Sequence, residues 1–448
     1  MTLPEVADPA PATDERVPRA DRLAAAGALG LIALACAAGA ALYLAGRPVR
    51  ATSAPFTGRW LPHAGPGTPL ALVVAALVVW WGPRLAERLG WRRLLAAGYA
   101  AAVAWIFALA LVDGWQRGLA GRLATGDEYL SEVPGVTDIP AMLRGFTSRI
   151  VDFQPDSWTT HVSGHPPGIL LVFVALDRIG LGGGAWAAML CVGAGALVAV
   201  AVPVTLRALG DEAAARAAVP FLVLFPGAVW IGASADGLFA GVTASGLALL
   251  AIGLTRRNLA AGFGAGLLLA FGLYLSYGLT LLVVPAVAVA LLARRLPWAT
   301  IVAAASGGAA VVAAFTLAGF WWLDGYHLVV VRYYQGIASH RPYAYWVWAD
   351  LALVAAAAGP AAAVILRRAA PKIGRLTPAV VLPCAGLLAI LAADVSGLSK
   401  AEVERIWLPF TVWLMAGAVL LPPPARRFWL LGQALIALLV NHLLLTTW

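Results

Sequence analysis

The sequence predicts an all-α protein, a polytopic bundle of about 12–14 transmembrane helices. Of its 448 residues, 61% are hydrophobic and 12% are charged, about half the charged share of a typical soluble domain. Apolar stretches such as 23–45 and 185–206 match the ~20 residues that cross a hydrocarbon core. These stretches do not alternate with polar residues, which argues against a transmembrane barrel. Because lipid offers backbone amides no partner, we expect helices.

Taken in order, the chain begins with residues 1–20, which are polar and proline-rich and predict a disordered cytoplasmic tail. Residues 21–448 are expected to form a single transmembrane domain, without an evident internal repeat. The expected helical segments are 23–45, 69–83, 94–113, 167–181, 185–206, 215–232, 236–255, 258–275, 278–293, 299–321, 347–367, 376–394, 407–422 and 426–446.

Arginine clusters predict the orientation, because basic residues are enriched on the cytoplasmic side. The clusters taken as cytoplasmic are Arg84, Arg88, Arg92 and Arg93, then Arg367, Arg368, Lys372 and Arg375, then Arg426 and Arg427. The N-terminus is then cytoplasmic, and the connections 114–166, 322–346 and 395–406 lie outside. If Arg256 and Arg257 are also inside, four crossings between 167 and 255 give the wrong parity. One of these four segments is expected to be re-entrant or merged with its neighbour.

The loop 114–166 is far longer than the usual connection of 4–6 residues. Loops of this length are either functional or disordered. Its aromatic residues, Trp158 among them, argue against disorder. Within it, Met142, Phe146 and Ile150 recur at helical spacing along 139–150. This pattern predicts an interfacial helix on the outer leaflet.

Asp127 and Glu128 stand side by side early in this loop. The simplest interpretation is a solvated turn, because adjacent side chains do not share a helical face. A carboxylate against an apolar wall can instead act as a general base. Two carboxylates can also hold a divalent cation such as Mg²⁺ or Mn²⁺ against a phosphate. If the protein uses a metal, these two residues are the expected ligands.

His161 and His165 lie four residues apart, directly before a predicted membrane helix that opens with Pro166 and Pro167. Proline suits the first helical turn, so the motif is also explained as a helix start with an interfacial histidine. A zinc site is disfavoured, because helical geometry would have to continue through Gly164 and the two prolines. Phosphate binding is the functional alternative.

Other ionisable residues lie at the expected outer helix ends. Asp236 lies between two apolar runs and is either a carboxylate in a surface turn or an intramembrane functional residue. Arg332, His340 and Arg341 are outer cations suited to a lipid phosphate. In the third outer loop, a solvated loop end is one interpretation. The other assigns Arg405 to a leaving phosphate and Glu404 to orienting that arginine.

The order of these motifs resembles the GT-C superfamily of membrane glycosyltransferases, especially protein O-mannosyltransferases and lipid A aminoarabinose transferases. There, an acidic motif in the first outer loop precedes HPPL at a helix start; here the sequence is Asp127-Glu128 followed by His165-Pro166-Pro167-Gly168. The segments 225–244, 273–285 and 403–410 resemble later motifs of these families, although Ser276 stands where lysine is common. The loop also follows the third segment instead of the first, which two additional N-terminal helices would explain.

The resemblance implies an inverting enzyme that takes a sugar from a polyprenyl phosphate in the outer leaflet. The acceptor would be an extracytoplasmic glycan, lipid or protein. Asp127 or Glu128 would be the base, with Asp127 preferred, and Arg405, Arg341, His161 or His165 would bind the phosphate. Nucleotide sugars are disfavoured, because no glycine-rich phosphate loop is evident. Apart from a divalent cation, no cofactor is expected.

Two other functions fit the same helix pattern: a transporter or flippase of a lipid-linked envelope intermediate, and a scaffold in an envelope complex. Transporters often show paired repeats and midplane charges, which we do not find. The net charge of +9 comes from clusters between apolar runs, so nucleic acid is not an expected partner, whereas membrane lipids are. Only Lys372 and Lys400 are lysines among 31 basic residues, a preference typical of GC-rich bacterial genomes. We therefore expect a bacterial plasma membrane protein.

Overall fold

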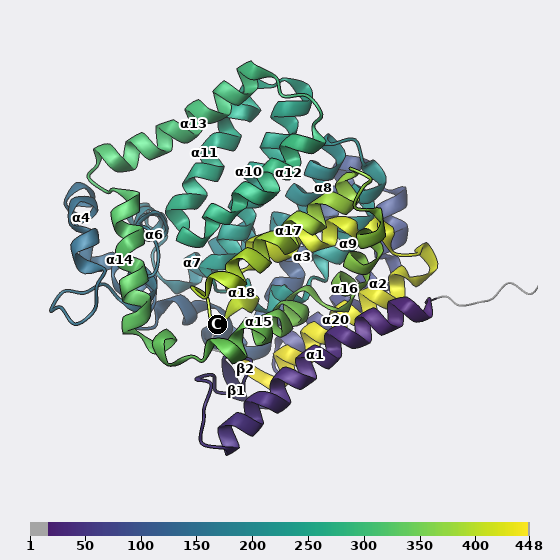
Figure 1. The fold of residues 1–448 in the computed structure, drawn as a ribbon, viewed down its shortest axis with the longest axis horizontal. Coiled ribbons are helices and arrows are strands. Elements are labelled where there is room, and N and C mark those ends of the chain that lie inside the picture. The colour runs from purple at the N-terminus through teal and green to yellow at the C-terminus, as the bar shows by residue number, and fades with distance from the viewer. Residues whose placement is uncertain (1–16, 447–448) are drawn as a thin grey trace, which may run out of the picture.

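The computed structural model describes residues 17–446, and almost all regular structure in this range is helical (Figure 1). Residues 1–16 of the expected tail lie outside the described range, and helix α1 begins at Arg19, slightly earlier than predicted. One small antiparallel sheet pairs β1 (Gly58–Trp60) with β2 (Leu444–Thr446), so the connection after α1 is joined to the end of the chain.

The helices follow the predicted segments closely. They are α1 (Arg19–Leu44), α2 (Gly67–Arg88), α3 (Trp91–Ala110), α4 (Ile139–Gly145), α5 (Thr160–Ser163), α6 (Gly168–Arg178), α7 (Gly184–Ala196), α8 (Val198–Ala208), α9 (Glu212–Val223), α10 (Ala235–Arg256), α11 (Leu259–Leu275), α12 (Val283–Leu292), α13 (Trp298–Leu317), α14 (Trp322–Gln335), α15 (Tyr343–Ala358), α16 (Pro360–Ala369), α17 (Pro378–Ser396), α18 (Val403–Ile406), α19 (Leu408–Thr411) and α20 (Arg426–Leu443). Short 3₁₀ helices include η7 (Pro226–Trp230), η8 (Tyr277–Leu282), η9 (Ile337–His340) and η11 (Val412–Leu420).

Within residues 17–446, seven helices are long and apolar enough to cross a membrane, and eight if one bent pair counts as a span. They are α1, α2, α3 with its last turn, α7 with α8, α10, α13 and α17. By this criterion the expected count of 12–14 is too high. The other segments are helical, but turns and breaks divide them: α11 has 17 residues, and 277–292 and 408–420 are also shorter apolar helices. The protein is thus an α-helical, multi-pass membrane protein.

The bent pair is α15 and α16, which meet at an angle of 103°. Gly359 forms the break with φ +74°, a left-handed conformation that favours glycine. Gln433 of α20 satisfies the backbone there: its amide donates to the Ala358 carbonyl at 2.8 Å and its oxygen accepts from the Ala361 N–H at 3.2 Å. A broken helix inside a membrane protein is stable when a neighbouring side chain supplies such bonds.

The first of the four expected segments between 167 and 255 forms α6. This helix has only 11 residues and contacts the short helices of the loop 114–166 at Tyr129–Ser131 and Val133–Gly135. Arg178 at its C-terminus donates to the Thr137 carbonyl at 3.0 Å, and the next helix, α7, begins at Gly184 in contact with Ala120. Segment 167–181 therefore leaves the loop and returns to it, without reaching the other end of the bundle.

The predicted helix over 139–150 is shorter than expected. Helix α4 ends at Gly145, and the side chains of Phe146 and Ile150 are fully buried. Phe146 packs against Trp158 and Phe320, with ring centroids 5.2 and 5.5 Å away. The helical spacing of these apolar residues therefore reflects packing within the protein.

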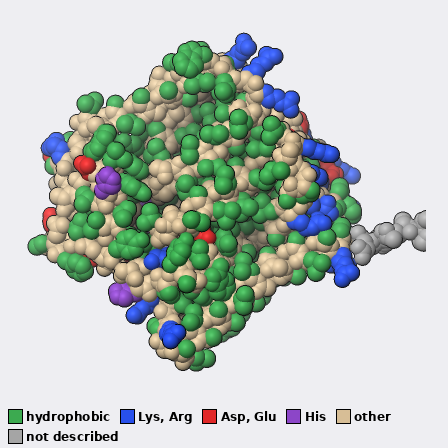
Figure 2. Space-filling view, viewed as in Figure 1, with side chains coloured by type: hydrophobic (Ala, Val, Ile, Leu, Met, Phe, Trp, Pro, Cys, Tyr) green, Lys and Arg blue, Asp and Glu red, His purple; other side chains and the backbone are tan. Residues whose placement is uncertain are grey.

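The two ends of the bundle differ in charge. Figure 2 shows most Lys and Arg side chains along the upper right edge, and Figure 1 draws the loop 114–166 and α14 on the opposite, left side. Asp21 in the first turn of α1 binds Arg367 and Arg368 at 2.7 and 2.6 Å, which fixes this turn to the basic connection after α16. The C-terminal end of α1 lies towards the other end of the bundle (Figure 1).

Candidate functional site

Arg405 is the centre of a buried ionic cluster that joins three distant parts of the chain. Its guanidinium donates to Asp236 Oδ2 at 2.7 Å and to Glu402 Oε2 at 2.8 Å. The same group lies 3.4 Å from His161 Nε2. All but Glu402 are less than 9% exposed, so water contributes little to their solvation. The mutual contacts therefore offset the cost of burying these charges.

Asp236 is held by the start of α10. Ser234 caps this helix by accepting from the Asp236 N–H at 3.1 Å, and its hydroxyl donates to Asp236 Oδ2 at 3.0 Å. The polar turn before α10 thus directs the carboxylate inward, onto Arg405. Of the two interpretations of Asp236, the structure supports a buried helix-end carboxylate and not a solvated surface turn.

Glu402 lies on a strained connection between α17 and α18. Ala401 and Glu402 have φ values of +69° and +63°, a conformation that costs non-glycine residues about 1–3 kcal/mol each. Asp350 of α15 accepts from the Ala401 N–H at 3.1 Å, and Glu402 is fixed by two arginines. Strain that neighbouring groups hold in place in this way is often found at functional sites.

His161 connects the long loop to Arg405. Its Nδ1 lies 2.9 Å from the Asp127 carbonyl and its Nε2 faces the arginine, which assigns the proton to Nδ1 and makes the ring neutral. Burial, with the nearby Arg405 charge, lowers the pKa of His161 to about 4. His165 is one turn further on: its Nδ1 lies 2.8 Å from the His161 carbonyl and 3.1 Å from the Tyr129 hydroxyl.

Glu128 and Asp127 have opposite environments. Glu128 is 5% exposed, with Oε1 3.6 Å from His161 Nδ1 and with no hydrogen-bond partner for Oε2 within the described chain. Burial raises the pKa of Glu128 to about 7, despite the opposing effect of Arg405. The Asp127 side chain is exposed, and its carbonyl instead binds His161. The resemblance favoured Asp127 as a base, whereas the geometry favours Glu128.

A second group of cations flanks the cluster. Arg341 donates to Glu402 Oε1 at 2.9 Å and to the Lys400 carbonyl at 2.6 Å, while the Lys400 ammonium donates to the Arg341 carbonyl at 3.1 Å. Glu402 thus bridges Arg341 and Arg405. Burial opposes its ionisation, but the two guanidinium groups outweigh burial and lower the pKa of Glu402.

The expectation that Glu404 orients Arg405 is wrong, because Glu402 makes that contact. Glu404 is 1% exposed, and neither carboxylate oxygen has a hydrogen-bond partner in the part of the chain that the structure describes. Burial raises the pKa of Glu404 to about 8. Glu402 directly precedes the four-residue helix α18 and lies one turn from Arg405, whereas the adjacent residues 404 and 405 point in different directions.

Arg332 and His340 do not contact the Arg405 cluster. Arg332 on α14 forms an ion pair with Asp152 at 2.5 Å, and His340 contacts only its neighbour Ser339, at 3.0 Å, among the hydrogen bonds of residues 17–446. The sequence analysis placed both residues with Arg341 because all three belong to the connection 322–346. Only Arg341 reaches the site.

The acidic pair does not have the geometry of a metal site. Glu128 points inward and Asp127 outward, so their carboxylates do not converge on one ion. Among residues 17–446, no group of three or more His, Cys, Asp or Glu side chains is arranged to hold a metal. The position between the buried acids is taken by the Arg405 guanidinium.

Two participants were not predicted as site residues. Tyr129 is 2% exposed and packs against the rings of both His161 and His165, at centroid distances of 5.8 and 5.7 Å. Glu402 bridges the two arginines. Tyr129 directly follows the acidic pair in the sequence. Glu402 lies three residues before Arg405, the spacing of neighbours on a helix. These two sequence features could have pointed to both residues.

No protein-family model matches the chain, and a search of curated proteins finds no match either. The resemblance to GT-C enzymes therefore remains a prediction from the motifs. Gly168 stands where the HPPL motif of those families has leucine. An added Cβ at this position would lie 2.4 Å from the Tyr274 carbonyl oxygen. Only glycine allows α6 to approach α11 this closely.

Proposed function

We propose that the protein is a membrane glycosyltransferase that uses a sugar linked to a polyprenyl phosphate. The observation that carries the proposal is the contact series Glu128–His161–Arg405–Asp236. It joins a carboxyl group with a pKa near neutrality to buried cations, at the end of the bundle opposite the arginine clusters. Glycosyl transfer needs a proton acceptor and a phosphate-binding cation within one site.

In this proposal Glu128 accepts the proton of the acceptor hydroxyl through Oε2, the oxygen without a protein partner in the described range. The hydroxyl oxygen then forms a bond to the anomeric carbon, and the bond from that carbon to the phosphate oxygen breaks with inversion. The phosphate leaves with the electron pair. Arg405 and Arg341 stabilise its charge, an electrostatic effect that usually contributes much of an enzyme's rate.

His161 has a positioning role. As a neutral ring it donates through Nδ1 and accepts from Arg405 through Nε2, so it fixes the arginine without adding a second positive charge. Its low pKa keeps it neutral throughout the physiological range. The membrane supplies the donor, and the acceptor is a glycan, lipid or protein of the cell envelope.

The test is transfer by purified protein in proteoliposomes. Radiolabelled polyprenyl-phosphate sugars, mannose and aminoarabinose among them, are incubated with envelope extracts, and new labelled products are separated by size. We expect a product with at least one donor, lost in Glu128→Gln and retained in the matched variant Asp127→Asn. Absence of any product with every donor, or full activity of Glu128→Gln, would contradict the proposal.

A further inference from the structure

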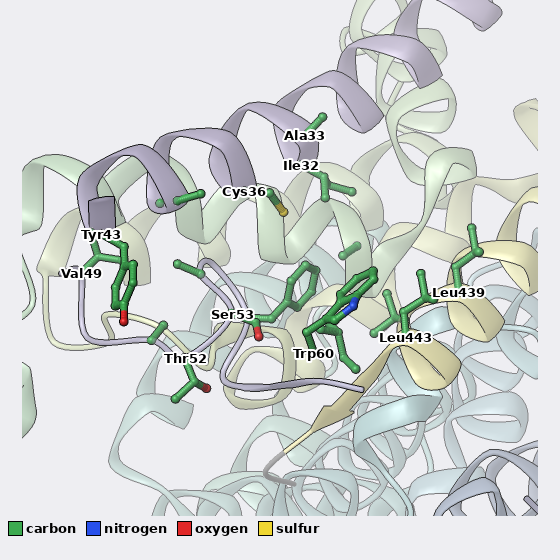
Figure 3. Close-up of a pocket in the computed structure, with 18 of the residues that line it drawn as sticks. Ile32, Ala33, Cys36, Tyr43, Val49, Thr52, Ser53, Trp60, Leu439 and Leu443 are labelled. Carbon is green, nitrogen blue, oxygen red and sulfur yellow. The ribbon is translucent and has the colours of Figure 1, made fainter. Parts of the chain in front are cut away.

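A long apolar groove lies between α1 and α20, on the outside of the bundle (Figure 3). Its volume is about 680 Å³, within the 300–1,000 Å³ that typically accommodates a small ligand. One wall is a face of α1 that includes Ile32, Cys36 and Tyr43, and the other includes Leu439 and Leu443 of α20. Figure 3 shows the connection after α1 closing one end, with Trp60 pointing across the groove.

Hydrogen bonds and close contacts hold the walls of the groove in place. Helix α1 rests on α15, where the Tyr345 hydroxyl donates to the Ala35 carbonyl at 2.9 Å. Below it, Trp346 donates to the Val49 carbonyl at 3.1 Å, which fixes the floor formed by the connection. At Gly39 an added Cβ would lie 2.6 Å from Ala54 Cβ, so the helix and the connection are in close contact there.

The groove is long enough to extend through the hydrocarbon depth of one leaflet. On α1 it extends from Leu29 to Leu44, roughly 22 Å at 1.5 Å per residue. Half of a hydrocarbon core is about 15 Å thick. Side chains at its open edge are strongly exposed, including Tyr43 at 72% and Leu44 at 85%. An acyl chain would cover this apolar surface over its whole depth.

The end of the groove carries positive charge. Arg47, Arg50 and Arg59 flank its lining residues, and all three side chains are exposed. In the range 17–446, no ion pair or side-chain hydrogen bond involves any of them. The sequence contains no Asp or Glu between Asp21 and Glu87 that could neutralise them.

These arginines lie at the end of the bundle that is expected to face the outside. The enrichment of basic residues on the cytoplasmic side therefore does not account for them. The connection that carries them binds the start of the loop 114–166, because His63 Nε2 lies 2.7 Å from Asp113 Oδ1. Helix α1 begins at the opposite, basic end, where Asp21 binds Arg367 and Arg368. Uncompensated cations beside a lipid-facing groove are suited to a phosphate group.

We propose that this groove binds one acyl chain of an anionic phospholipid from the leaflet at the site end, with the lipid phosphate held by Arg47, Arg50 and Arg59. The charge of the groove end selects an anionic head group over a zwitterionic one. The apolar walls select a lipid over a soluble anion. The proposal does not depend on glycosyl transfer.

Native mass spectrometry of the detergent-purified protein tests it, with phosphatidylglycerol and phosphatidylcholine added in equal amounts. We expect retention of phosphatidylglycerol, and at least about tenfold weaker retention when Arg47, Arg50 and Arg59 are all changed to Gln. The matched control changes Arg84, Arg92 and Arg93 to Gln, which removes equal charge at the other end and should leave binding unchanged. Equal loss in both triple variants would overturn the proposal.

Groove filling is the second arm. Ala40→Trp places a ring inside the groove, whereas Ala37→Trp adds the same ring to an exposed position on α1 that does not line it. The first should abolish retention of the bound lipid and the second should not. A photoreactive phosphatidylglycerol should label peptides of α1 or α20. Preferential retention of a polyprenyl phosphate, or a copurifying hydrophobic peptide in the groove, would refute the phospholipid assignment.

Discussion

The arginines of the basic end and those of the candidate site differ in burial. At the basic end, Arg84, Arg92 and Arg93 are exposed to solvent. At the other end, Arg341 and Arg405 are only 8% and 6% exposed and are bound by buried or partly buried acids. Exposed cations that orient a membrane protein cost little, whereas buried ones are costly and are usually retained for function. The comparison separates the exposed arginines of the basic end from the buried arginines of the candidate site.

The largest expected effect is on transfer activity in Glu128→Gln. Gln keeps the shape of the side chain but cannot accept the acceptor's proton, so the rate should fall about 10²–10⁴-fold. The assay is the proteoliposome transfer reaction, with the melting temperature in detergent as the folding control. If Asp127→Asn were the more damaging substitution, the exposed carboxylate would be the base and the comparison of the two acids would fail.

Arg405→Lys should lower the transfer rate about 10²–10³-fold, because lysine keeps the charge but cannot bind Asp236 and Glu402 through a planar fork. Arg405→Met removes the charge and leaves buried carboxylates unpaired, at a cost of about 3–5 kcal/mol in the free energy of unfolding. Denaturation and transfer are measured together. A lysine variant with wild-type kinetics would mean that the arginine is only structural.

The pH dependence of transfer should report the carboxyl of Glu128. A base acts in its ionised form, and burial raises the pKa of Glu128 to about 7. The rate should therefore be maximal above pH 7 and fall about tenfold per unit below it. His161, with its pKa lowered to about 4, should not contribute in this range. An unchanged rate between pH 7 and pH 5 would exclude Glu128 as the base.

The ion pair at the basic end should be structural. Asp21 is fully buried, but its partners Arg367 and Arg368 are 42% and 23% exposed, so solvent screens part of the interaction. Asp21→Asn should lower the free energy of unfolding by about 1–2 kcal/mol and leave the specific transfer activity unchanged. Thermal unfolding in detergent and the transfer assay distinguish these effects. Lost activity in a stable variant would show coupling between the two ends.

The smallest effect is expected for the exposed cluster. Changing Arg84, Arg92 and Arg93 to Gln should alter the unfolding free energy by less than about 0.5 kcal/mol per residue, since hydrated surface side chains contribute little. Correctly inserted protein should retain full transfer activity. Reporter fusions that reveal the orientation of the helices provide the control for insertion.

Much of this protein is determined by its sequence alone. Apolar runs fix where the helices form, because lipid leaves the backbone no other hydrogen-bonded state. Arginine clusters mark one end of the bundle, and the acidic pair, the histidines, Asp236 and Arg405 stand out as ionisable residues beside apolar segments. The spacing of Glu402 and Arg405 is also a local signal, since helix neighbours are set by the chain.

Only the tertiary structure decides which of these residues meet. Glu128 rather than Asp127 turns inward because the Asp127 carbonyl is bound by His161, a residue 34 positions away. Helix α6 packs its Gly168 on the Tyr274 carbonyl, and the α1–α20 groove forms between the two ends of the chain. Such choices depend on contacts between segments far apart in sequence, whose energies no local pattern contains. A one-dimensional pattern specifies helices and charges, whereas burial and pairing are properties of the assembled bundle.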